Sequence, residues 1–381
     1  MLDFSKISQR VRPVLYCALL LGVLSTIASC QEEEGALAGE AEAPPTVVVD
    51  PDGTVHVPAM TVPVSEFLSP EGQAYLAEHL TAIHDPESRK VIDGVPVFLR
   101  AYMDRQKELY PVVKTDTQIA GVHVYDYVPE EGVSEENERR VLINLHGGAF
   151  VTCWPACAEL ESVPIAALAK IRVVSVDYRQ GPDHRFPAAS EDVAAVYAEL
   201  LRTYPAENIG IYGCSAGGML TGMAVAWFQK HDLPAPGAVG IYCAGSAPPV
   251  MGFGGDANYT TAAIGEARAP FPPPDRPENG GPVYSPMLYL SEVDARDPLV
   301  APTTSDEVLS QFPPTQIITA TRGFELSSAV YTHSRLVKLG VEAELHVWEG
   351  LFHGFFYNPD PPESRDAYNV MVKFFDKHLG N

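Results

Sequence analysis

Basic residues are scarce in this sequence of 381 residues. Lys and Arg together number 26 against 49 Asp and Glu, so the formal net charge is -23 at pH 7. Proteins that bind nucleic acid neutralise phosphates with Lys and Arg, so this balance argues against a nucleic-acid partner, and we expect none. It also argues against electrostatic docking on anionic lipid. A small neutral substrate is compatible with it.

The apolar run near the N-terminus falls short of a comfortable membrane span. It extends from Val14 to Ala28 and follows the basic residues Lys6, Arg10 and Arg12. Fifteen residues make about 22 Å of helix, whereas the hydrocarbon core of a bilayer is about 30 Å thick. A basic head, a short apolar body and a small-residue exit are typical of a secretory signal.

The exit of this run, Ile27-Ala28-Ser29-Cys30, resembles the lipobox of bacterial lipoproteins. The resemblance implies that residues 1–29 are removed and that Cys30 carries acyl chains at the mature N-terminus. We therefore expect an exported, membrane-anchored lipoprotein that faces the periplasm or the cell surface. An ordinary secretory signal and an uncleaved anchor are the alternatives.

The rest of the chain divides into segments of different composition. Residues 30–45 contain five Glu and no base, which is typical of a solvated tether. Residues 46–112 are expected to form an N-terminal cap, because the stretch from about Val64 to Tyr110 is helical and amphipathic without strands. Residues 113–381 are expected to form the main domain, with a Gly- and Pro-rich cap insertion near residues 251–285.

Apolar β-branched runs alternate with helical patterns from about Val141 onward. The helix after Ser190 is the clearest, with Val193, Val196, Tyr197, Leu200 and Leu201 on one face and Ser190 as its N-cap. This alternation predicts a three-layer α/β fold with a mostly parallel sheet covered by helices on both faces. The predicted strands are Val141–Leu145, Val173–Val176, Ile209–Tyr212, Val239–Tyr242, Gln316–Thr319 and Leu345–Trp348.

A serine lies between a predicted strand and a predicted helix, in the motif Gly213-Cys214-Ser215-Ala216-Gly217. A sharp turn at this point exposes the serine Oγ near a helix N-terminus and requires small residues two positions away on either side. Ser215 is therefore a candidate nucleophile.

A second turn, His146-Gly147-Gly148-Ala149-Phe150, follows the strand Val141–Leu145. Its glycines leave backbone N–H groups approachable, as an oxyanion hole requires. Together with the N–H of Ala216, this turn is expected to bind a tetrahedral oxygen.

Nucleophilic attack by a serine also needs a base, and His353 follows the last predicted strand. A loop at the carboxyl end of that strand lets an imidazole reach the serine turn. His184, His333 and His346 are rivals; the last two lie within a predicted helix and strand, and His184 lies in a turn flanked by prolines.

Together these motifs resemble the hormone-sensitive-lipase-like branch of the α/β-hydrolase family, which includes bacterial carboxylesterases. The resemblance runs from about Val141 to Phe375, about three fifths of the chain. It implies that Ser215 is the nucleophile, that His353 is the general base, and that Gly148, Ala149 and Ala216 donate to the oxyanion. The other matching motifs are Tyr178-Arg179, Pro182-Asp183-His184-Arg185-Phe186-Pro187-Ala188, Pro313-Pro314 and His353-Gly354-Phe355.

The chain departs from this family where the triad aspartate is expected, because Gly323 occupies the matching position. Glu325 lies two residues further on, and its longer side chain is the candidate we favour to hold His353. The alternatives are Asp294, Asp297, Asp256 or no acid at all. Ala149 replaces the third glycine of the turn that is usual in this family, and the backbone N–H at this position is retained.

No cofactor or metal is expected. Cys214 and Cys243 are expected to be small buried hydrophobic residues. Cys153 and Cys157 are compatible with a disulfide in an exported protein and equally with free thiols.

The sequence thus predicts a serine carboxylesterase that hydrolyses small carboxylic esters through an acyl-enzyme intermediate on a lipid-anchored protein. The alternative is a non-catalytic lipoprotein that retains the pocket to bind an acyl or aromatic ligand, an interpretation that Gly323 favours. Fold and triad do not fix the acyl donor, so lactone, amide and acyl-transfer chemistry remain open.

Overall fold

The computed structural model describes residues 46–83, 85–88, 90–92, 95–248, 255–267 and 287–380. The chain divides into two units, Met1–Thr61 and Val62–Asn381. In the first unit, the described residues include an exposed antiparallel hairpin of β1 (Val48–Val49) and β2 (Val55–His56). The predicted signal, the lipidation site Cys30 and the tether 30–45 lie outside the described residues.

In the second unit, all six predicted strands are present with ends within two residues of the expected ones, so their prediction is confirmed. They are β7 (Val141–Leu145), β8 (Arg172–Val176), β9 (Ile209–Cys214), β10 (Ala238–Tyr242), β11 (Thr315–Ala320) and β12 (Ala343–Trp348).

These strands form one parallel array within an eight-stranded sheet of order β12-β11-β10-β9-β7-β8-β6-β5. The sheet is completed by β5 (Val112–Ile119) and β6 (Val122–Pro129), an antiparallel hairpin that the sequence analysis did not predict. The edge strand β5 is exposed along most of its length, so it lacks the apolar run by which the buried strands were found.

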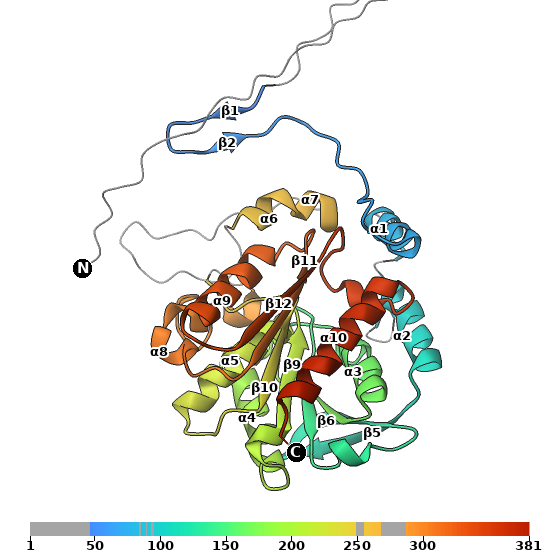
Figure 1. Cartoon of the computed structure of the whole chain (residues 1–381), viewed down its shortest axis with the longest axis vertical. Coiled ribbons are helices and arrows are strands. Elements are labelled where there is room, and N and C mark those ends of the chain that lie inside the picture. Colours follow the sequence, from blue (N-terminus) through green and yellow to red (C-terminus); the bar gives the residue numbers. More distant parts are fainter. Residues whose placement is uncertain are drawn as a thin grey trace, which may run out of the picture. The chain divides into compact units, whose positions relative to one another are not determined.

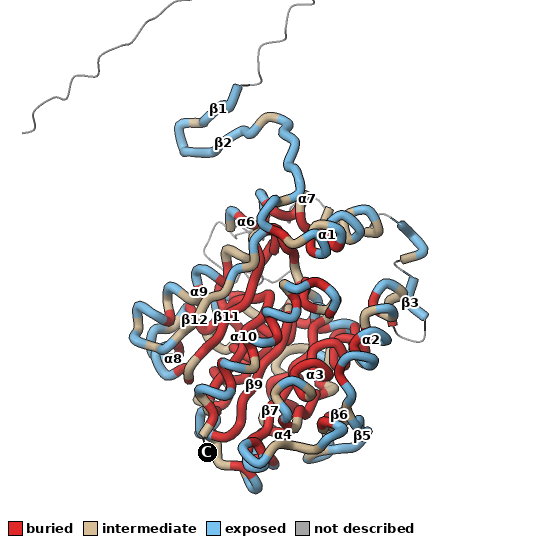
Figure 2. Tube along the Cα trace, turned by 45° about the vertical axis from the view of Figure 1, so that its right-hand side comes forward, coloured by how far each residue is buried: buried red, intermediate tan, exposed pale blue. Residues whose placement is uncertain are grey.

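Helices cover both faces of the sheet, as Figure 1 shows, and this confirms the three-layer α/β prediction. One face packs against α4 (Ala188–Leu200), α5 (Ala216–Lys230) and α9 (Leu326–Lys338), and the other against α3 (Ala156–Ala169) and α10 (Pro362–His378). Along β7, Val141, Ile143 and Leu145 enter the first core and Leu142 enters the second, because successive side chains of a strand point to opposite faces. Figure 2 shows that the central strands are buried, with exposed segments toward the outside of this unit.

Ser190 does not cap the helix in which it lies, so that prediction is wrong. Helix α4 begins at Ala188, and Ser190 is buried inside its first turn. The N–H of Ala189, which has no partner within the helix because it lies in the first turn, instead donates to Oη of Tyr289 at 2.8 Å. A tertiary partner therefore replaces the local cap.

The region between Val62 and Tyr110 contains α1 (Pro70–Ala82) and α2 (Val97–Leu109). The expectation of no strands there was wrong, since the short strands β3 (Val91–Ile92) and β4 (Val95–Pro96) form a hairpin. In the predicted cap insertion, the described part contains α6 (Asp256–Thr260) and α7 (Ala262–Gly265). The assignment of both regions to a cap stays a prediction.

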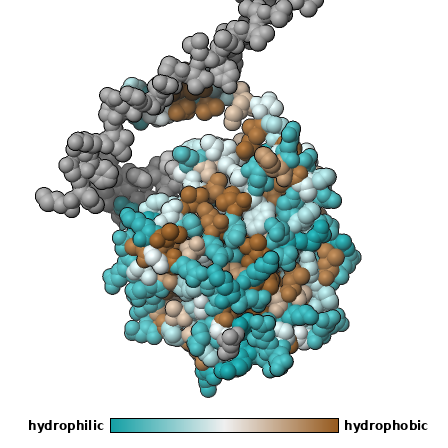
Figure 3. Space-filling model, in the orientation of Figure 1, coloured by the Kyte–Doolittle hydropathy of each residue, from teal (hydrophilic) through white to brown (hydrophobic). Residues whose placement is uncertain are grey.

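The remaining described helices are short. They are η1 (Glu135–Asn137), η2 (Ala206–Asn208), η4 (Leu288–Leu290), η5 (Pro302–Thr304), α8 (Asp306–Leu309) and η6 (Phe355–Tyr357). Within the described residues, no helix has the length and apolar character needed to cross a bilayer. On the face of the second unit drawn in Figure 3, hydrophilic residues predominate and apolar residues form separate patches.

We predict that truncating the centre of the sheet costs far more stability than truncating its edge. Ile211 in β9 is fully buried, so Ile211→Ala should lower the free energy of unfolding by about 2–5 kcal/mol through lost burial and a residual cavity. Val113→Ala on β5, where the side chain is 54% exposed, should change it by less than about 0.5 kcal/mol. Urea unfolding of both variants measures this, and equal losses would contradict the assigned sheet order.

Candidate active site

Ser215 occupies the sharp turn between β9 and α5, with φ 59° and ψ -121°. Such a conformation is strained for a residue with a side chain and persists only where its surroundings hold it. A Cβ at Gly213 would lie 2.2 Å from the carbonyl oxygen of Leu145, and one at Gly217 would lie 1.7 Å from it. The expectation of small residues on both sides of the serine therefore has a steric cause: this turn presses against the end of β7.

The turn after β7 is also tightly constrained. Gly148 has φ +116°, and a Cβ there would lie 2.1 Å from the carbonyl oxygen of Thr152. Ala149 and Phe150 follow with φ 56° and 59°. Among the described residues, no acceptor is hydrogen-bonded to the backbone N–H of Gly148, Ala149 or Ala216. The three expected oxyanion donors are thus available for a ligand.

His146, which opens this turn, is a buried structural residue. Its Nδ1 lies 2.6 Å from the carbonyl oxygen of Gly147, and its own carbonyl accepts from Oη of Tyr178 at 2.6 Å. Burial lowers the pKa of His146 to about 4, so the ring is neutral at physiological pH. Tyr178, which belongs to one of the motifs named above, thus contacts the residue that opens this turn.

His353 lies in the loop after β12, and β10 connects this loop to the serine turn. The N–H of Ser215 donates to the carbonyl oxygen of Tyr242 at 2.8 Å. The next residue, Cys243, accepts at Sγ from the N–H of Gly354 at 3.2 Å. The turn of Ser215 and the loop of His353 therefore both attach to the end of the same strand.

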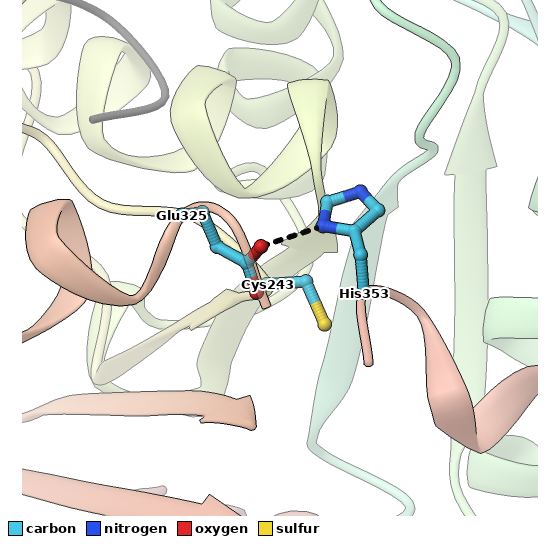
Figure 4. A group of neighbouring side chains, drawn as sticks. All are labelled: Cys243, Glu325 and His353. Carbon is cyan, nitrogen blue, oxygen red and sulfur yellow. Dashed lines mark hydrogen bonds and ion pairs between the residues drawn. The ribbon is translucent and has the colours of Figure 1, made fainter. Parts of the chain in front are cut away.

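The imidazole of His353 is hydrogen-bonded to Glu325. The distance from Nδ1 to Oε2 is 3.0 Å, and the other ring nitrogen faces away from the carboxylate (Figure 4). Oε1 of Glu325 accepts from Oγ1 of Thr319 at 2.9 Å. Glu325 is fully buried, so this carboxylate is held on both oxygens and fixes the orientation of the ring.

Gly323 provides the space for this arrangement. A Cβ at Gly323 would lie 2.5 Å from Oε1 of Glu325 and 2.9 Å from its carboxyl carbon. The carboxylate of Glu325 thus occupies the volume that a side chain at position 323 would fill. The chain therefore departs from the family pattern at two positions together: position 323 is a glycine, and the carboxylate of Glu325 occupies the space beside it.

The charges of the pair act on each other. Burial by itself lowers the pKa of His353, but the charge and hydrogen bond of Glu325 raise it to about 9. Burial raises the pKa of Glu325, but the neighbouring imidazolium and the hydrogen bonds from His353 and Thr319 keep this pKa below its usual value. The structure therefore favours an ionised carboxylate next to a strongly basic imidazole.

The rival residues have other roles in the structure. Asp294 and Asp297 accept from the N–H groups two residues further on, which shapes turns, and Asp256 begins α6. The rival residues His333 and His346 lie within a helix, α9, and a strand, β12, as the sequence predicts. Of the candidate acids, the one within hydrogen-bond distance of His353 is Glu325.

The four cysteines within the described residues divide into two pairs. Cys153 and Cys157 form a disulfide, one of the two states that the sequence left open. Cys214 and Cys243 are free and buried, as expected. Cys243, Glu325 and His353 offer ligand atoms within 4.8 Å of one another, but Nδ1 of His353 and Oε2 of Glu325 are already bonded to each other. A metal ion there would have to replace the proton shared between Nδ1 of His353 and Oε2 of Glu325. The arrangement therefore fits an oriented base better than a metal centre.

Sequence reasoning missed one buried group at this site, Glu161 of α3. Its carboxylate accepts from the N–H of Gly147 and from the N–H of Cys214, at 2.9 and 3.2 Å. No local pattern marks it, since it lies inside a helix between Leu160 and Ser162 and belongs to no sequence motif.

Comparison with known proteins relates this chain to hydrolases. Residues 142–357 match a family model described as alpha/beta hydrolase fold. An acetyl-hydrolase of Streptomyces hygroscopicus is 29% identical over 244 residues, 63% of this chain and 77% of the relative. The carboxylesterase/phospholipase LipF of Mycobacterium tuberculosis is 30% identical over 243 residues, 62% of this chain; the match spans only 61% of that relative.

Solved structures agree with these relatives. The crystal structure of an esterase named E25 superimposes with a TM-score of 0.69 at 29% identity, covering 85% of this chain and 99% of that one. An esterase from the bacterial hormone-sensitive lipase family superimposes with a TM-score of 0.67 at 24% identity, over 82% of this chain and 99% of that one, and shows the shared fold.

We predict that His353 titrates far above its ordinary pKa of 6.5, near about 9, because Glu325 stabilises the protonated ring. In Glu325→Gln the attraction is lost while burial remains, so the pKa should fall to 6.5 or below. NMR titration of the imidazole resonances measures both values. The same pKa in the two proteins would show that Glu325 does not control the charge of His353.

Proposed function

The chain belongs to the alpha/beta hydrolase fold family, in its hormone-sensitive-lipase-like branch, and on this basis we propose that it is a serine carboxylesterase acting on small carboxylic esters. The observation that carries the proposal is the hydrogen bond between Glu325 and His353, on a loop that attaches to the end of β10 as the strained serine turn does. The acetyl-hydrolase and carboxylesterase relatives support the same reaction class.

In the proposed acylation step, Oγ of Ser215 attacks the ester carbonyl carbon while Nε2 of His353 accepts the hydroxyl proton. The N–H groups of Gly148, Ala149 and Ala216 stabilise the negative charge that develops on the carbonyl oxygen. The tetrahedral intermediate collapses, the carbon–oxygen bond to the alcohol breaks, and His353 returns the proton to the leaving alcohol. Water then hydrolyses the acyl-enzyme by the same route.

Glu325 has two effects in this mechanism. It keeps Nδ1 protonated, so that Nε2 is the basic nitrogen, and it stabilises the imidazolium formed during attack. Since the neutral ring is the base, kcat/KM should rise with pH until about 9, the raised pKa of His353.

A non-catalytic lipoprotein that binds an acyl or aromatic ligand is the competing proposal. Its main support is the glycine at position 323, where the family carries an acid. The carboxylate of Glu325 fills the space that a side chain at position 323 would occupy, which weakens this support. Attachment to a membrane through Cys30 stays a prediction, because residues 1–45 lie outside the described part of the chain.

Ester hydrolysis should depend on all three side chains. With p-nitrophenyl esters of graded acyl length, Ser215→Ala and His353→Ala should each lower kcat by at least about 10⁴-fold. Glu325→Gln should lower it by about 10²- to 10⁴-fold and move the rise of kcat/KM to lower pH, because the base loses its orientation and its carboxylate. A fluorophosphonate probe should label the wild type but not Ser215→Ala. A folded wild type that neither turns over esters nor reacts with the probe would support the binding protein instead.

The pairing of Gly323 with Glu325 gives a second test. Gly323→Ala adds one methyl group, and the backbone φ of Gly323 is not in the left-handed region. The added carbon should nevertheless displace the carboxylate of Glu325 and lower kcat by about 10- to 100-fold, since small displacements of catalytic groups are costly.

The matched rescue moves the acid back to position 323. The double variant Gly323→Asp/Glu325→Ala should have a kcat at least about 10-fold above that of Glu325→Ala. Wild-type kcat in Gly323→Ala would mean that the carboxylate does not need this space, and the pairing would be rejected.

A further inference from the structure

We propose that Glu161 is a positioning residue that holds the oxyanion turn and the nucleophile turn in a fixed relation to each other. This rests on the proposed esterase function, since it assigns Glu161 a role in the same reaction. Glu161 lies on α3, is 4% exposed, and has no contact with Ser215 or His353 among the hydrogen bonds of the described residues.

The carboxylate of Glu161 bridges two strands just beyond the end of their ladder. The parallel pairing of β7 and β9 ends where Leu145 lies opposite Gly213. Past that point, Oε1 accepts from the N–H of Gly147 at 2.9 Å and Oε2 accepts from the N–H of Cys214 at 3.2 Å. Gly147 immediately precedes the expected donor Gly148, and Cys214 immediately precedes Ser215.

Two further donors hold the carboxylate in place. Oη of Tyr357 donates to Oε1 at 2.7 Å, and Nδ2 of Asn144 donates to Oε2 at 3.0 Å. The amide of Asn144 is oriented in turn, because its Oδ1 accepts from Oγ of Ser175 at 2.7 Å. Each carboxylate oxygen thus receives one backbone N–H and one side-chain donor.

This arrangement requires an ionised carboxylate rather than an amide. A carboxylate accepts on both oxygens, whereas the amide of glutamine has one accepting and one donating end. Either orientation of a glutamine at position 161 would direct an N–H at the N–H of Gly147 or at that of Cys214. Glu161→Gln therefore preserves size and shape but reverses one of the two bridging contacts.

Burial disfavours the charge of Glu161. None of its four donors is charged, and burial raises the pKa of Glu161 to about 7 although hydrogen bonds from Asn144, Tyr357, Gly147 and Cys214 lower it. Because the pKa of Glu161 is higher in the folded protein, the contribution of this group to the free energy of unfolding falls as pH rises from 4.5 to about 7. A carboxylate that burial disfavours, yet that contacts both turns, fits a functional role better than a structural one.

Glu159 provides a matched control two residues away on α3. It is 5% exposed, and its carboxylate contacts Nζ of Lys107 and of Lys114 at 3.0 and 2.7 Å, away from both turns. Glu159→Gln makes the same chemical change on the same helix but loses ion pairs that stabilise the fold.

The experiment compares wild type, Glu161→Gln and Glu159→Gln at pH 8, measuring kcat and KM for p-nitrophenyl acetate together with Tm. In Glu161→Gln, kcat should fall about 10- to 100-fold with KM within about threefold, because the misplaced donors and nucleophile matter most in the transition state. Its Tm should stay within a few degrees of wild type. In Glu159→Gln, kcat should stay within about twofold and any change should be in Tm.

A folded Glu161→Gln with kcat within about twofold of wild type would overturn the proposal, as would equal losses of kcat in the two variants. If Glu161→Gln does not fold, Tyr357→Phe decides, since it removes a single donor from Oε1. We then expect a kcat about 3- to 10-fold below wild type, and an unchanged kcat would overturn the proposal. A wild type without ester turnover or fluorophosphonate labelling would instead overturn the esterase function itself.

Discussion

The hydrogen bond from Nδ1 of His353 to Oε2 of Glu325 joins the loop after β12 to the loop after β11. It orients the imidazole of His353, and it raises the pKa of that imidazole. Gly323 leaves the volume that the carboxylate fills, and Thr319 holds its second oxygen. The proposed chemistry depends on this one contact, because a serine hydroxyl is a poor nucleophile without an oriented base.

The backbone around the site is strained, and the surrounding sheet holds it in place. Ser215, Ala149 and Phe150 all have positive φ, a conformation that side chains disfavour. Their turns lie at the carboxyl ends of adjacent buried strands, where the close approach of Leu145 to Gly213 and Gly217 fixes the geometry. The central sheet thus provides the rigidity that a pre-organised oxyanion site requires.

Two buried glutamates on α3 illustrate how neighbouring positions on one helix acquire different roles. Glu159 faces two lysines, and its charge is compensated by ion pairs. Glu161 faces four neutral donors at the ends of β7 and β9. The position of each side chain around the helix axis decides whether it pairs with surface cations or with the backbone of the site.

The sequence by itself determined the features that local patterns encode. The six buried parallel strands, the serine turn with its flanking glycines and the glycine-rich turn after β7 follow from apolar runs and from the steric demands of sharp turns. The sequence also singled out His353 and proposed Glu325 for its partner, but it could not exclude Asp294, Asp297 or Asp256, because a distance between loops is not a local property.

Only the tertiary structure decided which atoms meet. The exposed edge strand β5 lacked an apolar run, and the start of α4 was set by Tyr289, a residue about a hundred positions away, rather than by the nearby Ser190. The placement of Glu325 in the space beside Gly323 and the bridge made by Glu161 depend on contacts between segments far apart along the chain. Such contacts arise from the packing of the folded chain, and no spacing within a short window encodes them.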